Sequence, residues 1–278
     1  MDLKTLLDTP PWDWPEDVGK TFLKYLVDRR AKESDRMIAA DLAGDYVVIN
    51  DELADALLAV VGSANEPEEL RAKAAISFGP ALESADTDGF DDADDLPPIT
   101  ERMFRKIQDS LRKLYLDVNT PKLVRRRILE ASVRAVEPWH QDAIRDAYAS
   151  GDQEWMLTAV FGMKYVRGFD EQILAALESA DSEIQYEAVE AAGNWGLDAA
   201  WPHVVELVTD PDTPKGLLLA AIEAAGDIRP AEAREVLQEL ADSDDEEIAE
   251  AADEAIMMAE AASEDEFDEE EEEDDWIN

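Results

Sequence analysis

A pattern of small and apolar residues recurs along this chain about every 31 residues. It begins at residues 159, 188, 221 and 252, at steps of 29, 33 and 31. Related segments begin upstream at residues 39, 74 and 128, where one longer step of 54 residues leaves room for an insertion of about 20. A fixed period of this length is typical of a repeat array, in which each unit contacts its neighbours, and not of one compact core.

Each repeat predicts two helices. The segment DEQILAALESAD (170–181) places apolar side chains on one helical face, and the segment after it carries small residues at helical spacing, such as Ala188 and Ala191. The dipeptides Thr120-Pro121 and Thr213-Pro214 lie 93 residues apart, and both predict a helix start with Thr as N-cap and Pro at the first helical position. Neither helix of a repeat can cover its apolar face alone, so the repeats must stack. We predict an all-α fold of about seven helix pairs between residue 15 and about residue 262.

The start of the second helix carries a further motif. Leu70-Arg71, followed by Ala74 and Ala75, and Val124-Arg125 match the pattern [VL]-R-x-x-A-A-x-A-[LF]-G. This pattern resembles HEAT repeats of the short, bacterial phycobilin-lyase type. The resemblance covers about 80% of the chain, and it implies a right-handed α-solenoid in which Arg125 is a structural residue that pairs with acidic residues of the turns. Repeats of this kind serve as scaffolds and adaptors and in a few enzymes, so the resemblance is specific for fold and weak for function.

Three further segments flank or interrupt the array. Residues 1–32 contain four large aromatic side chains and are predicted to cap the N-terminal end of the stack formed by residues 33–262. An acidic insertion at about 84–98 is predicted to be a solvated loop. Residues 263–278 carry eleven carboxylates and no basic residue, and they are predicted to form a disordered acidic tail.

The charge of the chain restricts its partners. It has 68 acidic and 25 basic residues, a formal net charge of −43. Such a charge repels nucleic acid and anionic lipid and attracts basic partners, although adaptation to salt or for solubility explains it equally well. There is no cysteine, which fits a reducing cytoplasm, and neither a signal peptide nor a membrane-spanning segment is expected.

The sequence offers little for catalysis or metal binding. Glu137 and His140, and His203 and Glu206, have the spacing of carboxylate–histidine ligands, but HEAT-type hydroxylases use adjacent His-Glu pairs and this chain has none. With Gly89 placed at the turn, Asp86, Asp88 and Asp95 fall on ligand positions of an EF-hand calcium loop, although a solvated acidic loop explains them better. We expect no catalytic residue, no cofactor and no bound metal.

Basic residues concentrate in one place. Residues 102–134 hold ten basic and three acidic residues, including the run Arg125-Arg126-Arg127. Helical spacing predicts that Arg126, Arg127, Glu130 and Arg134 face outward. The resemblance to HEAT repeats implies that the second helices line a groove, into which Arg126 and Arg127 would project. The equivalent positions of the next repeats complete a predicted groove that passes from basic through aromatic to acidic: Arg126, Arg127, Glu130, Leu157, Thr158, Phe161, Tyr186, Glu187, Glu190, Leu219 and Glu223. A solvated helix face remains the alternative for the charge run.

The leading functional hypothesis is a monomeric, non-catalytic scaffold that binds a protein or peptide in this groove. An acidic segment is one candidate ligand for the arginines, and the chain's own tail, which ends in Trp276 and Ile277, is an example. Two alternatives remain open: a bilin-lyase-like enzyme subunit, and an acidic chaperone or nucleic-acid mimic that binds basic proteins.

Overall fold

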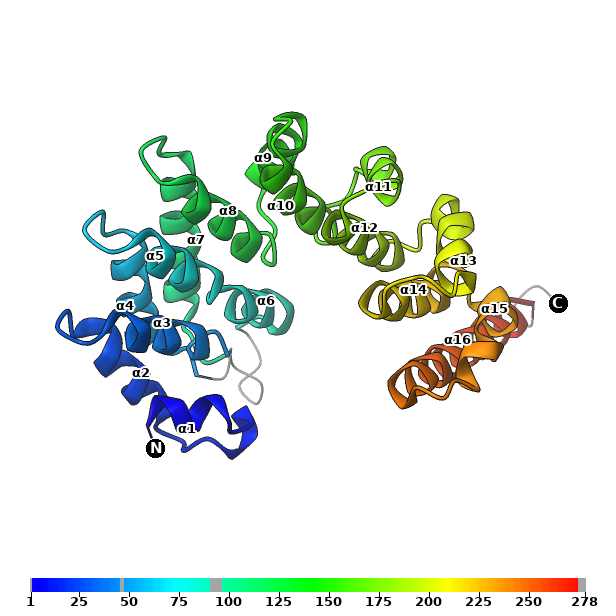
Figure 1. The fold of residues 1–278 in the computed structure, drawn as a ribbon, viewed down its shortest axis with the longest axis horizontal. Helices are drawn as coiled ribbons and strands as arrows, with labels where there is room; N and C mark the ends of the chain where they lie inside the picture. The colour runs from blue at the N-terminus through cyan, green and yellow to red at the C-terminus, as the bar shows by residue number, and fades with distance from the viewer. Residues whose placement is uncertain (1, 46–47, 91–96, 275–278) are drawn as a thin grey trace. The chain divides into compact units, whose positions relative to one another are not determined.

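The computed structural model describes the backbone of residues 2–45, 48–90 and 97–274, and side chains as far as residue 261. In these segments every regular element is a helix (Figure 1). The chain divides into two compact units, Met1–Ala143 (unit 1) and Ile144–Asn278 (unit 2), and the boundary falls within helix α9 (Pro138–Ala149). None of the described helices is long and apolar enough to span a membrane.

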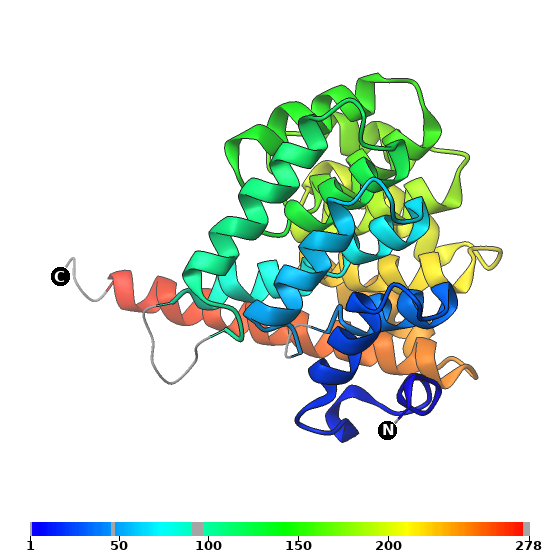
Figure 2. The same cartoon turned by 90° about the vertical axis from the view of Figure 1, so that its left-hand side faces the viewer.

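Unit 1 is a stack of helix pairs. In each pair, α2 with α3, α4 with α5 and α7 with α8, the two helices pack against each other, and the second helices α3, α5 and α8 are also neighbours. Figure 2 shows these helices, coloured blue to green, following one another through the stack. The elements are α1 (Leu3–Leu7), η1 (Pro11–Asp13), α2 (Val18–Val27), α3 (Glu33–Leu42), α4 (Asp51–Val61), α5 (Glu68–Ile76), α6 (Gly79–Asp88), α7 (Glu101–Leu116) and α8 (Lys122–Ser132).

Unit 2 repeats the same arrangement. Helices α11 and α12, α13 and α14, and α15 and α16 form pairs, and the second helices α10, α12, α14 and α16 follow one another as neighbours. With the three pairs of unit 1, the described helices form six such pairs, where about seven were predicted, and the all-α solenoid prediction is confirmed. The elements are α10 (Gln153–Met163), α11 (Asp170–Leu177), α12 (Ser182–Asn194), η2 (Asp198–Ala200), α13 (Trp201–Thr209), α14 (Lys215–Ile228), α15 (Pro230–Ala241) and α16 (Glu246–Asp274).

Small side chains allow the second helices to approach closely. Ala188, Ala191 and Ala221 are fully buried between neighbouring helices. At Gly193 of α12, an added Cβ would lie 3.1 Å from both Cα and Cβ of Ala224 of α14. This contact is tighter than two ordinary side chains permit, which explains the recurrence of small residues in the repeat.

An arginine ties the two helices of each pair together in unit 1. Nε of Arg71, the fourth residue of α5, donates to the carbonyl of Val61 at the end of α4 (2.9 Å). Nε of Arg125, the fourth residue of α8, donates to the carbonyl of Tyr115 (2.8 Å). Carbonyls in the last turn of a helix lack intrahelical donors and carry a partial negative charge, so a buried cation satisfies both needs. Arg125 therefore binds the end of the first helix of its own repeat, a contact that the sequence did not predict.

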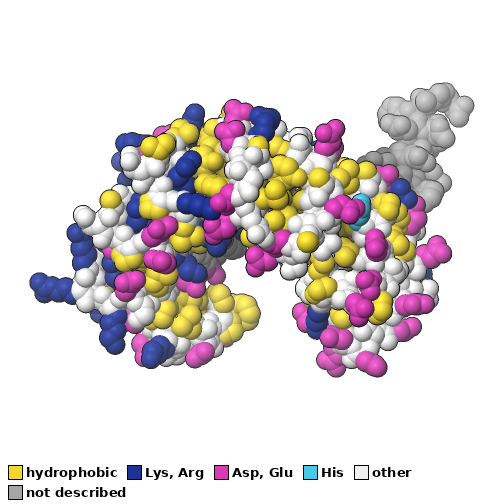
Figure 3. Space-filling model, turned by 45° about the horizontal axis from the view of Figure 1, so that its top comes forward, with side chains coloured by type: hydrophobic (Ala, Val, Ile, Leu, Met, Phe, Trp, Pro, Cys, Tyr) yellow, Lys and Arg dark blue, Asp and Glu magenta, His cyan; other side chains and the backbone are white. Residues whose placement is uncertain are grey.

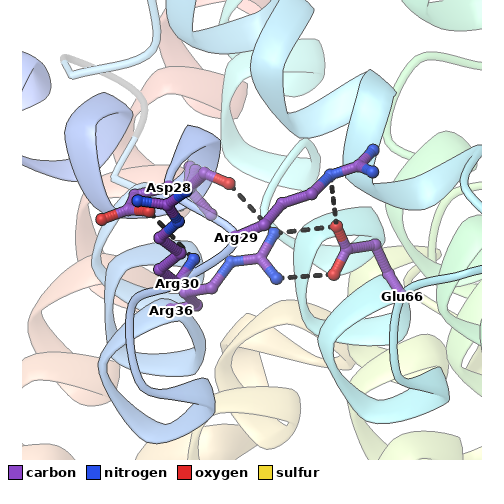
Figure 4. A network of polar contacts seen from close by, with 6 residues as sticks. Asp28, Arg29, Arg30, Arg36 and Glu66 are labelled. Carbon is purple, nitrogen blue, oxygen red and sulfur yellow. Dashed lines mark hydrogen bonds and ion pairs between the residues drawn. The ribbon is translucent and has the colours of Figure 1, made fainter.

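Arg36 of α3 extends this arrangement. Its Nη2 donates to the carbonyl of Leu26 (3.0 Å), and its guanidinium also binds both carboxylate oxygens of Glu66, at 2.5 and 3.0 Å (Figure 4). Nε of Arg29 lies 3.8 Å from the same carboxylate. The hydrogen bonds from Arg36 hold the pKa of Glu66 below its ordinary value. Since Glu66 precedes α5, this forked ion pair joins the first repeat to the second.

Two helix starts differ from the prediction. Helices α8 and α14 begin at Lys122 and Lys215, and Pro121 and Pro214 are the N-cap residues, with no side-chain cap from the threonines. Pro121 has extended backbone (φ −54°, ψ 149°), and its carbonyl accepts the first helical hydrogen bond, from the amide of Arg125. The fixed φ of proline suits this position as well as the first helical one.

The N-terminal segment contributes more than a cap. Helix α2, within the predicted cap 1–32, pairs with α3 as the first helix of the first repeat. Trp14 packs edge-on against the buried Phe22, with ring centroids 5.6 Å apart, and its Nε1 donates to the carbonyl of Thr9 (2.8 Å). Trp12 is 83% exposed and takes no part in this packing.

The acidic insertion begins as a helix. Instead of a loop from residue 84, α6 continues through Asp88 and ends at Gly89, which has a positive φ of 71°. Leu82 and Ala85 are buried, so the apolar face of α6 extends the helix into the insertion. Residues 91–96 lie outside the described residues.

The C-terminal segment also differs from the prediction of a disordered tail. Helix α16 continues as far as Asp274. Glu has good helix propensity, and lengthening an existing helix requires no new nucleation, so charge density alone does not end it. Trp276 and Ile277 lie outside the described residues.

Candidate functional site

The two units differ sharply in charge. Unit 1 contains 19 basic and 29 acidic residues, whereas unit 2 contains 6 basic and 39 acidic residues. On the face shown in Figure 3, Lys and Arg side chains (dark blue) gather over the helices of unit 1. The excess negative charge is therefore concentrated in unit 2. Because unit 2 has only six basic residues, each of them strongly affects the electrostatic potential around it.

A groove of about 810 Å³ runs between α14 and α16 in unit 2. Its apolar lining, which we call the floor, consists mainly of small side chains, with Leu219 and Ala220 from α14 and Ala251 and Met258 from α16. Met258 is 73% exposed although it is apolar. Small residues hold α14 and α16 together and leave the space above them empty. We call this feature the acidic groove because carboxylates form its rim.

The rim carboxylates have few partners. Glu223 and Asp227 project from successive turns of α14, and Glu250 and Glu254 from successive turns of α16. None of these four carboxylates forms an ion pair within the described part of the chain. Lys215 at the start of α14 is already bound to Asp245 and Glu247, with Nζ–O distances of 2.7 Å.

Two of these carboxyls, Glu223 and Asp227, have raised pKa values. Burial raises the pKa of Glu223 above its ordinary value, and the negative charges of Asp227 and Glu190 raise it further. Burial likewise raises the pKa of Asp227. Both carboxylates are ionised at a cost, which a cation placed in the groove would remove.

A cluster of side chains around Lys164, which we call the lysine cluster, borders the acidic groove and includes Tyr186, Glu187 and Glu190. Nζ of Lys164, from the end of α10, lies 2.8 Å from Glu187 and 2.6 Å from Glu190, and its side chain is only 12% exposed. The Tyr186 hydroxyl donates to the other oxygen of Glu190 (2.8 Å), and Nζ of Lys164 lies 4.5 Å from the centroid of the Phe161 ring. A smaller hollow of about 190 Å³ connects Lys164 and Glu190 with Glu223 and Asp227.

The protonation states in this cluster are well defined. Burial alone would lower the pKa of Lys164, but Glu187 and Glu190 outweigh it and raise the pKa above its ordinary value. Burial and the nearby Glu190 raise the pKa of Tyr186 to about 12. Lys164 is therefore positively charged at neutral pH, and its charge is paired with Glu187 and Glu190. Tyr186 is neutral and donates a hydrogen bond to Glu190.

Part of the predicted groove is assembled here. Five predicted residues from α12 and α14 lie in the acidic groove or in the lysine cluster beside it: Tyr186, Glu187, Glu190, Leu219 and Glu223. On α10, Leu157 and Phe161 are half-buried. Thr158, predicted to line the groove, is fully buried, so that prediction is wrong.

The prediction that Arg126 and Glu130 face outward is also wrong. Each residue is only 5% exposed, and Arg126 Nη2 lies 3.9 Å from Glu130 Oε1. Helix α8 packs against α5, α6 and α7, so most of its circumference is covered, whereas the prediction assumed a single buried stripe. Arg127 and Arg134 are partly exposed but already bound, to Glu130 at 2.5 Å and to Glu83 at 2.6 Å.

The groove residues that the sequence reading missed follow from the same repeat. A step of 31 residues from Leu219, Ala220, Glu223 and Asp227 leads to Glu250, Ala251, Glu254 and Met258, all of which line the acidic groove. The predicted groove residues ended one repeat before these. Lys164 was also missed, although it is one of only six basic residues in unit 2.

The histidine and aspartate candidates have local partners. His140 is fully buried; its Nδ1 accepts from the amide of Glu137 (2.9 Å), and its Nε2 lies 3.0 Å from the Ser132 hydroxyl. His203 lies 3.4 Å from Glu178, and the side chain of Glu137 accepts from Trp139.

Asp86 and Asp88 lie in the last turn of α6, where residues two apart point in different directions, and Asp95 is outside the described residues. The calcium-loop interpretation therefore fails for these two, because an EF-hand loop would have to present them together. Among the described residues, no three His, Cys, Asp or Glu side chains gather closely enough to hold a metal ion.

Residues 171–257 match the sequence profile of the HEAT repeats. The match extends from α11 into α16 and so includes the repeats that form the acidic groove. Residues 171–257 of this chain are HEAT repeats. Such repeats typically act as protein-interaction scaffolds and are generally non-catalytic.

Solved structures resemble this chain at low sequence identity. One is human deoxyhypusine hydroxylase in complex with glycerol, with 13% identity over 88% of this chain and 97% of that chain and a TM-score of 0.37. Another is the complex in which Kap95p binding induces the switch loops of RanGDP to adopt the GTP-bound conformation. It has 14% identity over 92% of this chain and 42% of that chain, with a TM-score of 0.43. No curated protein sequence gives a significant match.

Proposed function

We propose that this HEAT-repeat protein is a non-catalytic scaffold whose second unit binds a basic, amphipathic protein segment in the acidic groove. One observation carries the proposal. Glu223 and Asp227 form no ion pair with any described residue and have raised pKa values, and they lie at the rim of a groove whose floor is apolar. A ligand that fits must bring cations for the rim and apolar side chains for the floor.

The energetics favour several weak contacts. One exposed ion pair contributes about 0.2–1 kcal/mol, so a ligand must engage several of the rim carboxylates together. An apolar side chain placed against Leu219 and Met258 adds the free energy of burying exposed apolar surface. The surplus of 33 negative charges in unit 2 attracts a basic segment from a distance and speeds its association.

The acidic-chaperone hypothesis requires different features of the same surface. A chaperone for basic proteins needs negative charge alone, whereas a groove ligand also needs the apolar floor. The bilin-lyase-like alternative gains no support, because the propionate groups of a tetrapyrrole would meet the unpaired rim carboxylates. The decisive contrast is therefore between charge alone and charge combined with apolar contact.

The test uses the full chain and a fluorescein-labelled amphipathic helical peptide of Lys and Leu, followed by fluorescence anisotropy at about 0.1 M salt. The combined variant Glu223→Gln, Asp227→Asn should weaken binding about 3- to 10-fold, as expected for two lost exposed ion pairs. The combined variant Leu219→Ser, Met258→Ser should weaken it by a similar factor. Glu235→Gln with Glu239→Gln is the matched control, because both residues are exposed on α15 of the same unit and neither lines the groove.

Each pattern of results has one meaning. Loss with both groove variants, and not with the control, supports the proposal. Loss with the charge variant alone indicates an acidic chaperone surface. If the groove variants and the control behave alike, the acidic groove is not the binding site.

A further inference from the structure

We propose that the outward face of α7 in unit 1 is a second binding surface, which takes an acidic protein segment. This basic face of α7 consists of five exposed cationic side chains: Arg102, Arg105, Lys106, Arg112 and Lys113. It belongs to a different unit from the acidic groove and has the opposite sign. The proposal does not depend on the function proposed for unit 2.

The helix separates its two faces cleanly. Met103, Ile107, Leu111 and Tyr115 form a buried stripe at steps of four residues along α7. Viewed along the helix, the five cations fall within about 120° on the opposite side. Arg102 and Lys113 are eleven positions apart, which corresponds to about 16 Å at a rise of 1.5 Å per residue.

Three of the five cations are not engaged. Arg105 is bound to Glu101 (2.6 Å), and Lys106 is bound to Asp55. Arg102, Arg112 and Lys113 form no ion pair with any residue that the structure describes. These three cations lie on one helix face of a chain whose net charge is −43. Their alignment on one face leaves a strip of positive charge available to a ligand.

A hollow lies along one part of the strip, and exposed apolar side chains lie at its C-terminal end. A shallow hollow of about 500 Å³ lies along Arg102, Lys106 and Asp109. At the C-terminal end, Leu116 continues the row and is 62% exposed, and Val118 just beyond it is 84% exposed. A ligand that fits is therefore a short acidic segment with an apolar side chain near one end.

Charge over a longer range favours a short acidic segment over nucleic acid. A nucleic acid is a continuous polyanion, and beyond the strip of about 16 Å it would run over a surface that carries net negative charge. A short acidic segment places its charges only where the cations are. At about 0.15 M salt the Debye length is about 8 Å, so the repulsion from the rest of the chain is screened while contacts at the strip persist. Binding should therefore be strongest at moderate salt and weaker both at about 0.01 M and at about 1 M.

The test uses the full chain and a labelled peptide with the sequence of residues 263–278, SEDEFDEEEEEDDWIN, which combines an acidic run with Trp276 and Ile277 near one end. The combined variant Arg102→Glu, Arg112→Glu, Lys113→Glu should weaken its binding at least 10-fold, measured by anisotropy at about 0.1 M salt. Lys4→Glu, Lys20→Glu, Lys24→Glu is the matched control. It makes the same change in net charge at exposed positions of unit 1 outside α7, and it should change affinity less than twofold.

The remaining measurements keep the result unambiguous. All three proteins should have the same helical circular dichroism, because the changed residues are exposed. Leu116→Ser should weaken binding of this peptide without altering net charge, which a purely electrostatic effect would not produce. Equal losses in the α7 variant and the control would overturn the proposal. It would also be overturned if a single-stranded oligonucleotide of equal charge bound more tightly than the peptide.

Discussion

Nε of Arg71 donates to the carbonyl of Val61, ten residues earlier in the chain, across the turn between α4 and α5. The same offset of ten residues connects Arg36 with Leu26 and Arg125 with Tyr115. In α12 of unit 2 the equivalent fourth residue is Gln185, whose amide donates to the carbonyl of Leu177 (3.0 Å). A side-chain donor at this position is thus a recurring device that satisfies the end of the first helix of a repeat.

Arg71→Ala should destabilise unit 1 by about 1.5–3 kcal/mol, the usual value of a hydrogen bond to a charged group, because the carbonyl of Val61 would be left buried. The urea midpoint should fall, with little change in the slope of the transition. Arg71→Gln should recover part of the loss, as Gln185 does naturally. Arg105→Ala, which removes an exposed ion pair, should change stability by less than about 0.5 kcal/mol. Equal effects at positions 71 and 105 would show that the helix-end contact has no special role.

Arg126→Glu should strongly destabilise unit 1. Arg126 and Glu130 are each 5% exposed, so the substitution would bury two carboxylates one helical turn apart. Disruption of a buried ion pair typically costs about 3–5 kcal/mol. Arg127→Lys keeps a cation beside Glu130 at a partly exposed position and is the matched control. Thermal unfolding followed by circular dichroism distinguishes the two, and a variant Arg126→Glu as stable as the control would place Arg126 at the surface after all.

The sequence predicted the repeat architecture well, because that architecture depends on features with a fixed period. Small residues such as Ala188 and Ala221 recur with the period, and both are fully buried. The insertion and the C-terminal segment were predicted less well. Charge density was used as evidence against a helix, but at Ala85 a buried apolar face decides the outcome.

The candidate site was predicted only in part, because exposure in a stacked repeat depends on neighbours that a single helix does not reveal. Tyr186 and Glu223, which helical spacing placed on an open helix face, line the acidic groove. Arg126 was placed wrongly because α8 is covered on several sides. Lys164 and Glu190 form an ion pair although they are 26 positions apart, and no local sequence pattern predicts a contact over that separation.

His140 should remain neutral in the folded protein at pH values where an ordinary histidine is charged. Burial, and then the positive charge of Arg112, lower the pKa of His140 to about 3. The unfolded chain binds a proton near the ordinary value of 6.5, whereas the folded chain does not. Stability therefore falls as pH drops below about 6.5, by up to about 1.4 kcal/mol per pH unit.

An NMR titration of the imidazole nitrogens checks the folded state directly. The His140 signals should stay in the neutral form to about pH 4. His140→Asn keeps an acceptor for the amide of Glu137 and should flatten the pH dependence of the thermal midpoint between about pH 6.5 and pH 4. A midpoint profile identical to that of the unaltered protein would exclude His140 as the group responsible.

Glu223→Gln combined with Asp227→Asn should stabilise the free protein at neutral pH. Burial raises the pKa of both carboxyls, so the folded state binds protons more readily than the unfolded state just above the ordinary values of 4.5 and 3.8. Stability therefore falls as pH rises through that window, and the cost persists at pH 7, where both groups are ionised. Neutral side chains remove this cost, and the thermal midpoint at pH 7 should rise by about 1–2 °C, as expected for surface substitutions in a chain of this size.

The gain should disappear below about pH 4, because the original carboxyls are then protonated as well. Addition of the basic amphipathic peptide at pH 7 should reverse the order. The peptide supplies cations to Glu223 and Asp227 and so stabilises the unaltered protein more than the variant. A variant that is less stable than the unaltered protein at pH 7 without peptide would mean that these carboxylates already have favourable partners, and the acidic groove would lose its reason to bind a cationic segment.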